Sequence, residues 1–201
     1  VAAAGGALAA FDASLPFTLT AGQVSVGQEI AEDLAQPHPM NRLLQGEVGS
    51  GKTLVALRAM LTVADSGGQS AVLAPTEVLA SQHYSSMAAS LGPELSAKLG
   101  LTLLTGQMST ADRKRAMLAI VSGKAQLVIG THALIANKVE FYDLGLIVID
   151  EQHRFGVEQR EALRLKGKTA PHVLTMTATP IPRTLAVTVF GDLDVSTLTE
   201  L

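Results

Sequence analysis

Eight consecutive residues have the types and spacing of a phosphate-binding loop, the P-loop. They read Gly46-Glu47-Val48-Gly49-Ser50-Gly51-Lys52-Thr53. Gly49 and Gly51 allow a tight turn that points amide N–H groups inward, where a Cβ would obstruct. The N-terminus of the next helix adds partial positive charge, Lys52 can reach the β- and γ-phosphates, and the Thr53 hydroxyl can ligate Mg²⁺. A chance Gly-rich turn is the alternative; the apolar strand before and the helix after favour the P-loop.

Two carboxylates, Asp150 and Glu151, directly follow the apolar run Leu144–Ile149. This pattern is typical of a Walker B strand, in which the first carboxylate holds the Mg²⁺ shell and the second orients or deprotonates the attacking water. Acidic residues often end strands, so the pair alone is a weak signal. Together with the P-loop it predicts phosphoryl transfer, which needs both a cation clamp and a positioned water.

Thr177-Ala178-Thr179 places two hydroxyls around a small residue at the end of another apolar run. The segment is either functional or an N-cap for the next helix, and the residues alone leave this open. His153, three residues after Asp150, could bridge the carboxylates to this segment, although a surface or satisfied core histidine is the alternative.

Other polar residues give weaker signals. The Gln23 amide can donate and accept, which suits an adenine edge, but a surface glutamine is the alternative. Loops after predicted strands could present backbone to phosphates; they hold Thr76, Glu77, Thr105, Gly106 and Thr131.

The chain alternates short apolar runs with longer helical segments. We predict strands at 43–44, 71–74, 101–104, 126–130, 144–149 and, as the last one, 172–176. We predict helices at 20–34, after the P-loop up to 67–68, from 77 to about 92, from 109 to 123, and from Pro182 to about Gly191, with a short helix after Thr131-His132. This order predicts an α/β fold with a parallel sheet, whose ligands lie at the carboxyl ends of the strands.

Composition limits the possible functions. The 201 residues suffice for one α/β domain, and 47% hydrophobic residues with a mean hydropathy of +0.31 fit a sheet buried on both faces. Residues 1–14 are mostly small; we predict a partly helical segment near Leu8 to Ala13 and expect a linker or the end of a preceding domain. No run is apolar enough to span a membrane. The absence of cysteine excludes disulfides and fits a reducing cytosol.

The charge and the aromatic content oppose a strong stand-alone nucleic-acid binder. The net charge is −3, Trp is absent, and only two Tyr are present. A base-stacking platform is therefore not expected, and any nucleic-acid contact should use backbone amides and hydroxyls on phosphates.

Taken together, the motifs resemble the superfamily 2 helicases, most closely the bacterial branch-migration helicases, from Leu15 onward. The most specific blocks are 37–46, 150–157 and 176–185, and 191–196 adds to them. Transcription-repair coupling factors are similar across these blocks but usually depart from the Asp-Glu-Gln-His form. The resemblance implies a three-layer RecA-like P-loop NTPase domain with a mainly parallel central sheet. Residues 15–201 would then be the ATP-binding first motor lobe of an ATP-dependent DNA helicase.

The resemblance also implies roles for single residues. Lys52, Asp150, Glu151 and His153 would be catalytic, with ATP and Mg²⁺ as cofactors and Thr53 and Asp150 at the metal. Gln23 would read the adenine with Phe17 near the base. DNA-backbone contacts would come from Pro75, Thr76, Glu77, Thr105, Gly106, Thr131 and His132. Thr177, Ala178 and Thr179 would link hydrolysis to DNA movement. Glu47 stands where an Asp is more usual in this family. Gln107-Met108 replaces the family's Ser-rich continuation after Thr105-Gly106, so the resemblance implies no DNA contact beyond Gly106.

The implied partners are branched double-stranded DNA and, in cis, a wedge domain and a second motor lobe with the arginine finger. We expect both domains to lie outside this sequence, so the lobe alone should be inactive. The protein should be a monomeric, cytoplasmic, nucleoid-associated enzyme that remodels stalled forks and Holliday junctions, with no membrane partner. A P-loop nucleotide switch and a small-molecule kinase are the alternatives. Asp150-Glu151 and the 177–179 segment oppose the first, and the lack of a recognisable lid opposes the second.

Overall fold

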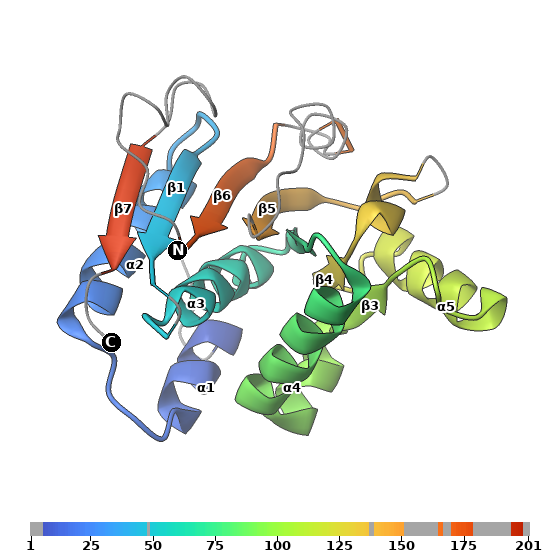
Figure 1. The fold of residues 1–201 in the computed structure, drawn as a ribbon, viewed down its shortest axis with the longest axis horizontal. Coiled ribbons are helices and arrows are strands. Elements are labelled where there is room, and N and C mark those ends of the chain that lie inside the picture. The colour runs from blue at the N-terminus through green and yellow to red at the C-terminus, as the bar shows by residue number, and fades with distance from the viewer. Residues whose placement is uncertain are drawn as a thin grey trace.

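One parallel sheet forms the centre of the protein (Figure 1). The computed structural model describes residues 6–47, 49–136, 139–150, 165–166, 170–178 and 194–198. Within these ranges the strands are β1 (Asn41–Gly46), β2 (Gln69–Leu73), β3 (Thr102–Leu104), β4 (Leu127–Gly130), β5 (Leu144–Asp150), β6 (His172–Thr177) and β7 (Asp194–Leu198). They lie in the order β3-β4-β2-β5-β6-β1-β7, and every recorded pair is parallel. The predicted α/β class and parallel sheet are confirmed.

Helices cover both faces of this sheet. They are α1 (Ala7–Ser14), α2 (Ala21–Leu34), α3 (Lys52–Asp65), α4 (Glu77–Leu99), α5 (Thr110–Val121) and the 3₁₀ helix η1 (His132–Ile135). Alternate residues of β5 face opposite sides, as the period of a strand requires. Leu146 and Val148 join the core with α1 to α4, while Ile147 and Ile149 join the core with α5 and η1. The result is the three-layer arrangement that the resemblance implied.

Local sequence signals set the helix ends near the site. Thr20 caps α2, and its hydroxyl accepts a hydrogen bond from the Gln23 N–H. Helix α3 starts directly after Gly51, which adopts φ +88°, and it ends before Gly67, which also adopts φ +88°. Ser109 caps α5 by accepting from the Asp112 N–H. These starts and stops follow the predictions closely.

One prediction about the fold is wrong, and another is incomplete. The 172–176 segment is not the last strand, because β7 follows it and pairs with β1. The sequence of β7 is short and polar, so it carries no apolar strand signal. Helix α4 is interrupted at Gly92 (φ +81°), where the predicted helix was expected to end, but a second helical stretch that was not predicted continues from there to Leu99. Pro93 is compatible with a helical restart, since its missing N–H costs nothing in a first turn.

Helix α1 packs on the body of the domain. Phe11 is fully buried, and Asp12 pairs with Arg58 of α3 at 2.9 Å. The Asp65 carboxylate accepts hydrogen bonds from the N–H groups of Ala7 and Leu8 at the start of α1. The predicted helical segment is therefore present and attached to α3, whereas its assignment to a linker or a preceding domain stays a prediction.

Candidate active site

The strand register brings the P-loop and Asp150 to the same edge of the sheet. Strand β6 lies between β1 and β5, and its residue Met176 pairs with Leu44 on one side and Asp150 on the other. Neighbouring strands are about 4.8 Å apart, so Leu44 and Asp150 lie about 10 Å from each other across β6. The P-loop begins two residues after Leu44. Two motifs about 100 residues apart in sequence thus face one another.

The P-loop has the glycine geometry that its sequence predicts. Gly49 and Gly51 both adopt φ +88°, a conformation that other residues rarely take. A Cβ at Gly46 would collide with Ser50 Oγ, and a Cβ at Gly51 would collide with Gln23 Nε2. Ser50 Oγ is buried and has no hydrogen-bond partner among the described residues. Val48 lies outside those residues. The loop therefore holds a buried polar atom that a bound oxyanion could satisfy.

Lys52 is bonded to the loop itself. Its Nζ donates to the carbonyl oxygen of Gly46 and, at 3.1 Å, to that of Glu47. Partial burial lowers the pKa of Lys52, and the nearby Asp150 carboxylate opposes this by favouring the charged form. The ammonium group is thus within the electrostatic reach of Asp150, and a phosphate oxygen could replace the carbonyl acceptors.

Asp150 has a partner that the sequence did not reveal. The Nε2 atom of His83 on α4 lies 2.7 Å from Asp150 Oδ2, and the exposed fractions of the two side chains are 14% and 6%. The helical spacing could have shown that His83 faces the core, because it is three residues after Ala80 and four before Met87, which are both buried. Residues at these spacings share one helix face, so His83 had to face the core.

Gln23 is buried, not a surface residue. It is 7% exposed, and its Oε1 accepts a hydrogen bond from the Thr20 N–H at 3.0 Å. Its amide nitrogen lies beside Gly51, as the collision described above shows. The side chain thus joins the start of α2 to the P-loop. Phe17, four residues before Ala21, is 55% exposed and lies on the surface.

A buried arginine holds α2 in place. Arg42 of β1 contacts Asp33 at 2.7 Å and Glu29 at 3.2 Å, both on α2, and it donates to Ser196 Oγ of β7 at 2.7 Å. The Arg42 side chain is buried while its carboxylate partners are partly exposed, so loss of the carboxylates would leave a buried guanidinium without its ion pairs. The cluster therefore fixes the helix that carries Gln23 against the strand that leads into the P-loop.

The remaining candidates follow β2, β3 and β4, at the other end of the same edge. We call these loops the outer half, and the residues that follow β1, β5 and β6 the P-loop half. In the outer half, Glu77 Oε1 accepts from the Gln107 N–H at 3.1 Å, and Arg113 donates to the Gly106 carbonyl at 2.5 Å. The Thr76 hydroxyl caps α4 by accepting from the Leu79 N–H.

The outer half is open to solvent but does not expose every predicted residue. An open groove of about 550 Å³ is lined by Glu77, Val78, Ser81, Gln82, Ser85 and Gln107. Thr76, Gly106 and His132 are exposed and Pro75 is half-buried, whereas Thr105 and Thr131 are only 4% and 6% exposed. A ligand could therefore reach these two threonines mainly through backbone groups.

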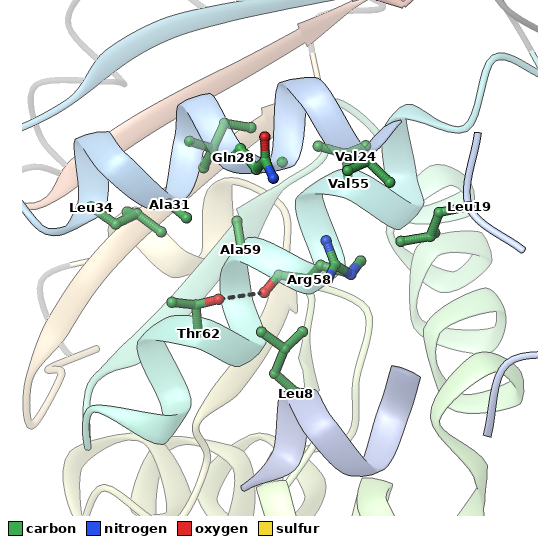
Figure 2. Close-up of a pocket in the computed structure, with 12 residues that line it drawn as sticks. Leu8, Leu19, Val24, Gln28, Ala31, Leu34, Val55, Arg58, Ala59 and Thr62 are labelled. Carbon is green, nitrogen blue, oxygen red and sulfur yellow. Dashed lines mark hydrogen bonds between the residues drawn. The ribbon is translucent and has the colours of Figure 1, made fainter. Parts of the chain in front are cut away.

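A separate cavity lies behind α3 (Figure 2). It measures about 210 Å³ and lies between α1, α2 and α3, with Leu8, Ala31 and Ala59 among its lining residues. No P-loop residue lines it, so it is not the candidate nucleotide site.

Some predicted residues cannot be placed. Glu151, His153 and Thr179 lie outside the described residues, as does the predicted helix after Pro182. Thr177 at the end of β6 is buried and Ala178 is exposed. Within the described ranges, no group of three or more His, Asp or Glu could hold a metal ion.

The comparison with protein families decides the classification. The model of the DEAD/DEAH box helicase family matches residues 23–187. The chain belongs to the DEAD/DEAH box helicase family. The resemblance to superfamily 2 helicases predicted from the motifs is thus confirmed.

Two relatives and one solved structure of this helicase-family chain are all named RecG. This chain is 55% identical over 197 residues to the ATP-dependent DNA helicase RecG of Mycobacterium leprae (strain TN), covering 93% of this chain and 26% of the relative. It is 54% identical over 188 residues to RecG of Streptococcus pneumoniae serotype 4 (strain ATCC BAA-334 / TIGR4), covering 94% and 27%. A structure of RecG bound to a three-way DNA junction matches with a TM-score of 0.77 and 42% identity, covering 96% of this chain and 25% of that one.

This helicase-family chain spans about a quarter of the length of these relatives. Among the helices of the described residues, none combines the length and apolar character needed to cross a bilayer.

The described residues fit a magnesium–nucleotide ligand. Gly49 and Gly51 both adopt φ +88°, as a tight phosphate-binding turn requires, and the Ser50 hydroxyl lacks a partner among the described residues. In the part of the chain that the structure describes, Lys52 Nζ donates to the carbonyl oxygens of Gly46 and Glu47, which a phosphate could replace. Asp150 supplies a buried carboxylate within electrostatic reach of Lys52. This donor set is an anion cradle beside a hard-cation ligand.

Proposed function

We propose that this chain is the ATP-binding first motor lobe of a translocase that moves on branched double-stranded DNA and remodels stalled forks and Holliday junctions. One observation carries the proposal: a P-loop with a facing carboxylate occupies one half of a strand-end edge, and open loops occupy the other half. Similarity to RecG, including the structure with a three-way DNA junction, supports DNA as the partner.

In the P-loop half, the backbone around Gly49 and Gly51 and the Lys52 ammonium bind the phosphates. Thr53 and Asp150 hold Mg²⁺, which neutralises phosphate charge when bound. Glu151 orients or deprotonates the attacking water, and His153 links the carboxylates to the 177–179 segment. The resemblance supports these last two roles.

The adenine is read beside α2. Gln23 has its oxygen committed to the Thr20 cap, so its amide N–H groups are the part that faces the P-loop. The exposed Phe17 packs against the base. Because Gln23 touches both the helix cap and Gly51, its position depends on the shape of the P-loop.

In the outer half, DNA phosphates meet backbone groups of the loops at 75–77, 105–106 and 131–132. The burial of Thr105 and Thr131 favours backbone contacts over hydroxyl contacts there. The segment Thr177-Ala178-Thr179 then links hydrolysis to DNA movement.

The rest of the motor is supplied by other domains of the full-length protein. A second lobe carries the arginine finger, and a wedge domain recognises the junction. The motor lobe itself comprises residues 15–201. The packing of α1 on α3 supports treating α1 as part of the same folded body. The protein acts as a monomer in the cytoplasm, associated with the nucleoid.

The test is phosphate release by the full-length protein without DNA, with linear duplex and with a three-way junction. Turnover that rises most with the junction supports the proposal. A hydrolysis rate that does not change when DNA is added would favour the nucleotide-switch alternative.

A further inference from the structure

Helix α4 connects the two halves of the strand-end edge. It begins at Glu77, whose side chain accepts the Gln107 N–H of the outer half. His83 lies six residues further along, about 9 Å at 1.5 Å per residue. The break at Gly92 comes after His83, so the helix is uninterrupted between Glu77 and His83. One short rigid segment therefore runs from the outer half to the P-loop half.

At its inner end this segment contacts the candidate magnesium ligand. His83 Nε2 lies 2.7 Å from Asp150 Oδ2, and both side chains are largely shielded from water. An ionised carboxylate offers only acceptors, so Nε2 is the donor in this contact. A hydrogen bond to a charged group in such a shielded place is stronger than one in water. It fixes the plane of the Asp150 carboxylate.

His83 also has little freedom to choose another position. It lies on the core-facing side of α4 between Ala80 and Met87, which are 0% and 1% exposed. Their packing holds this stretch of the helix against the sheet, and Asp150 ends the buried strand β5. The contact therefore joins two well-packed elements and not two mobile side chains.

We propose that His83 is a positioning residue for the magnesium carboxylate: its ring donates to Asp150 Oδ2 and turns the carboxylate toward the metal. The inference rests on the proposed function, because it needs Asp150 to hold Mg²⁺. Residues that donate to metal-binding carboxylates set the orientation of the ligand, and their loss typically weakens metal binding by about 10–100-fold.

The experiment compares three variants of the full-length protein with the wild type. His83→Ala removes the donor. His83→Leu removes it while filling the space, in case the alanine variant does not fold. His83→Gln restores an amide N–H near the position of Nε2. His38→Ala, at an exposed histidine in the loop before β1, is the control.

The first readout is Mn²⁺ binding in the presence of a non-hydrolysable ATP analogue, measured by electron paramagnetic resonance. We expect the Mn²⁺ affinity to fall about 10-fold or more in His83→Ala and His83→Leu. It should return to near the wild-type value in His83→Gln and stay unchanged in His38→Ala. The second readout is DNA-stimulated turnover, where kcat should fall while the DNA concentration for half-maximal rate stays constant.

The outcomes separate this inference from the proposed function. Wild-type protein that binds no Mn²⁺ with the nucleotide analogue would overturn both. Equal Mn²⁺ affinities in the wild type and in folded His83→Ala or His83→Leu would overturn the inference alone. The same holds if His83→Gln is as weak as the leucine variant, because the hydrogen bond would then not be the cause.

Discussion

The P-loop half and the outer half differ in how their polar groups are satisfied. In the outer half the loops bind one another: Glu77 holds the Gln107 N–H, and Arg113 holds the Gly106 carbonyl. In the P-loop half, Ser50 Oγ has no partner among the described residues, and Lys52 uses the carbonyls of its own loop. These two pairs hold the outer-half loops to one another, whereas the P-loop half keeps an unpartnered hydroxyl among the described residues and an ammonium group bonded within its own loop. The predictions below test this contrast.

The largest effect should come from testing this chain by itself. Its P-loop half should bind nucleotide weakly, since one lobe contacts only one side of it. Hydrolysis should be essentially absent, because loss of an arginine finger typically costs about 10³–10⁵-fold in rate. The measurement is a Mg-ATP titration of the purified chain, followed by phosphate release with and without a model fork. DNA-stimulated turnover near that of the full-length protein would contradict the proposal that this chain is one of two motor lobes and needs the other for hydrolysis.

Lys52→Ala in the full-length protein should abolish DNA-stimulated hydrolysis, a loss of at least about 10²-fold on the scale of removing one preorganised charge. The variant should still fold, because Lys52 is the first residue of α3, is only partly buried and contributes little packing. Steady-state phosphate release and a melting curve check both statements. Normal turnover of the Lys52→Ala variant would contradict the P-loop assignment. Loss of its cooperative melting transition would mean that Lys52 is needed for folding.

Glu77→Ala tests the outer half. It removes the acceptor for the Gln107 N–H, so the loop after β3 should loosen. We expect apparent DNA affinity of the full-length protein to fall about three- to tenfold, the scale of about 1 kcal/mol for one hydrogen bond, while DNA-independent hydrolysis stays unchanged. Fluorescence anisotropy with a labelled junction measures the affinity. Glu77→Gln keeps an oxygen acceptor and should bind the junction with wild-type affinity. An equal loss of DNA affinity in both variants would mean that the negative charge of Glu77 matters and its hydrogen bond to the Gln107 N–H does not.

The smallest effect compares two serines, one in each half. Ser50→Ala deletes a buried hydroxyl without a described partner, so folding stability without nucleotide should rise by up to about 1 kcal/mol. Ser109→Ala deletes a helix N-cap, so stability should fall by about 1 kcal/mol. Chemical denaturation of each variant gives both values. Shifts of the same sign would contradict the contrast between the two halves.

The sequence predicted the parts of the site that short-range rules control. A strand, a Gly-rich turn and a helix in order identified Gly46–Thr53, and an apolar run ending in a carboxylate identified Asp150. Local periodicity also gave the parallel sheet, which places strand ends at one edge whatever the strand order.

The missed parts depend on contacts between distant residues. The pairing of His83 with Asp150 joins positions 67 residues apart, and no local pattern names the partner. The bonding of Lys52 to the loop carbonyls depends on the three-dimensional shape of the folded loop. The capping role of Gln23 was detectable, because glutamine three residues after an N-cap threonine is the capping-box pattern.

The strand β7 has a consequence for solubility. It pairs with β1 and thereby makes the P-loop strand internal, with Leu43 and Leu44 fully buried. Unpaired apolar strand edges invite other chains to add to a sheet, and proteins limit this with short, polar or charged edge strands. The edges here follow that rule, since β3 has three residues and β7 has five, with Asp194 exposed at its start. A fragment ending before Asp194 would expose the backbone of β1 and tend to aggregate through the strand that leads to its nucleotide site.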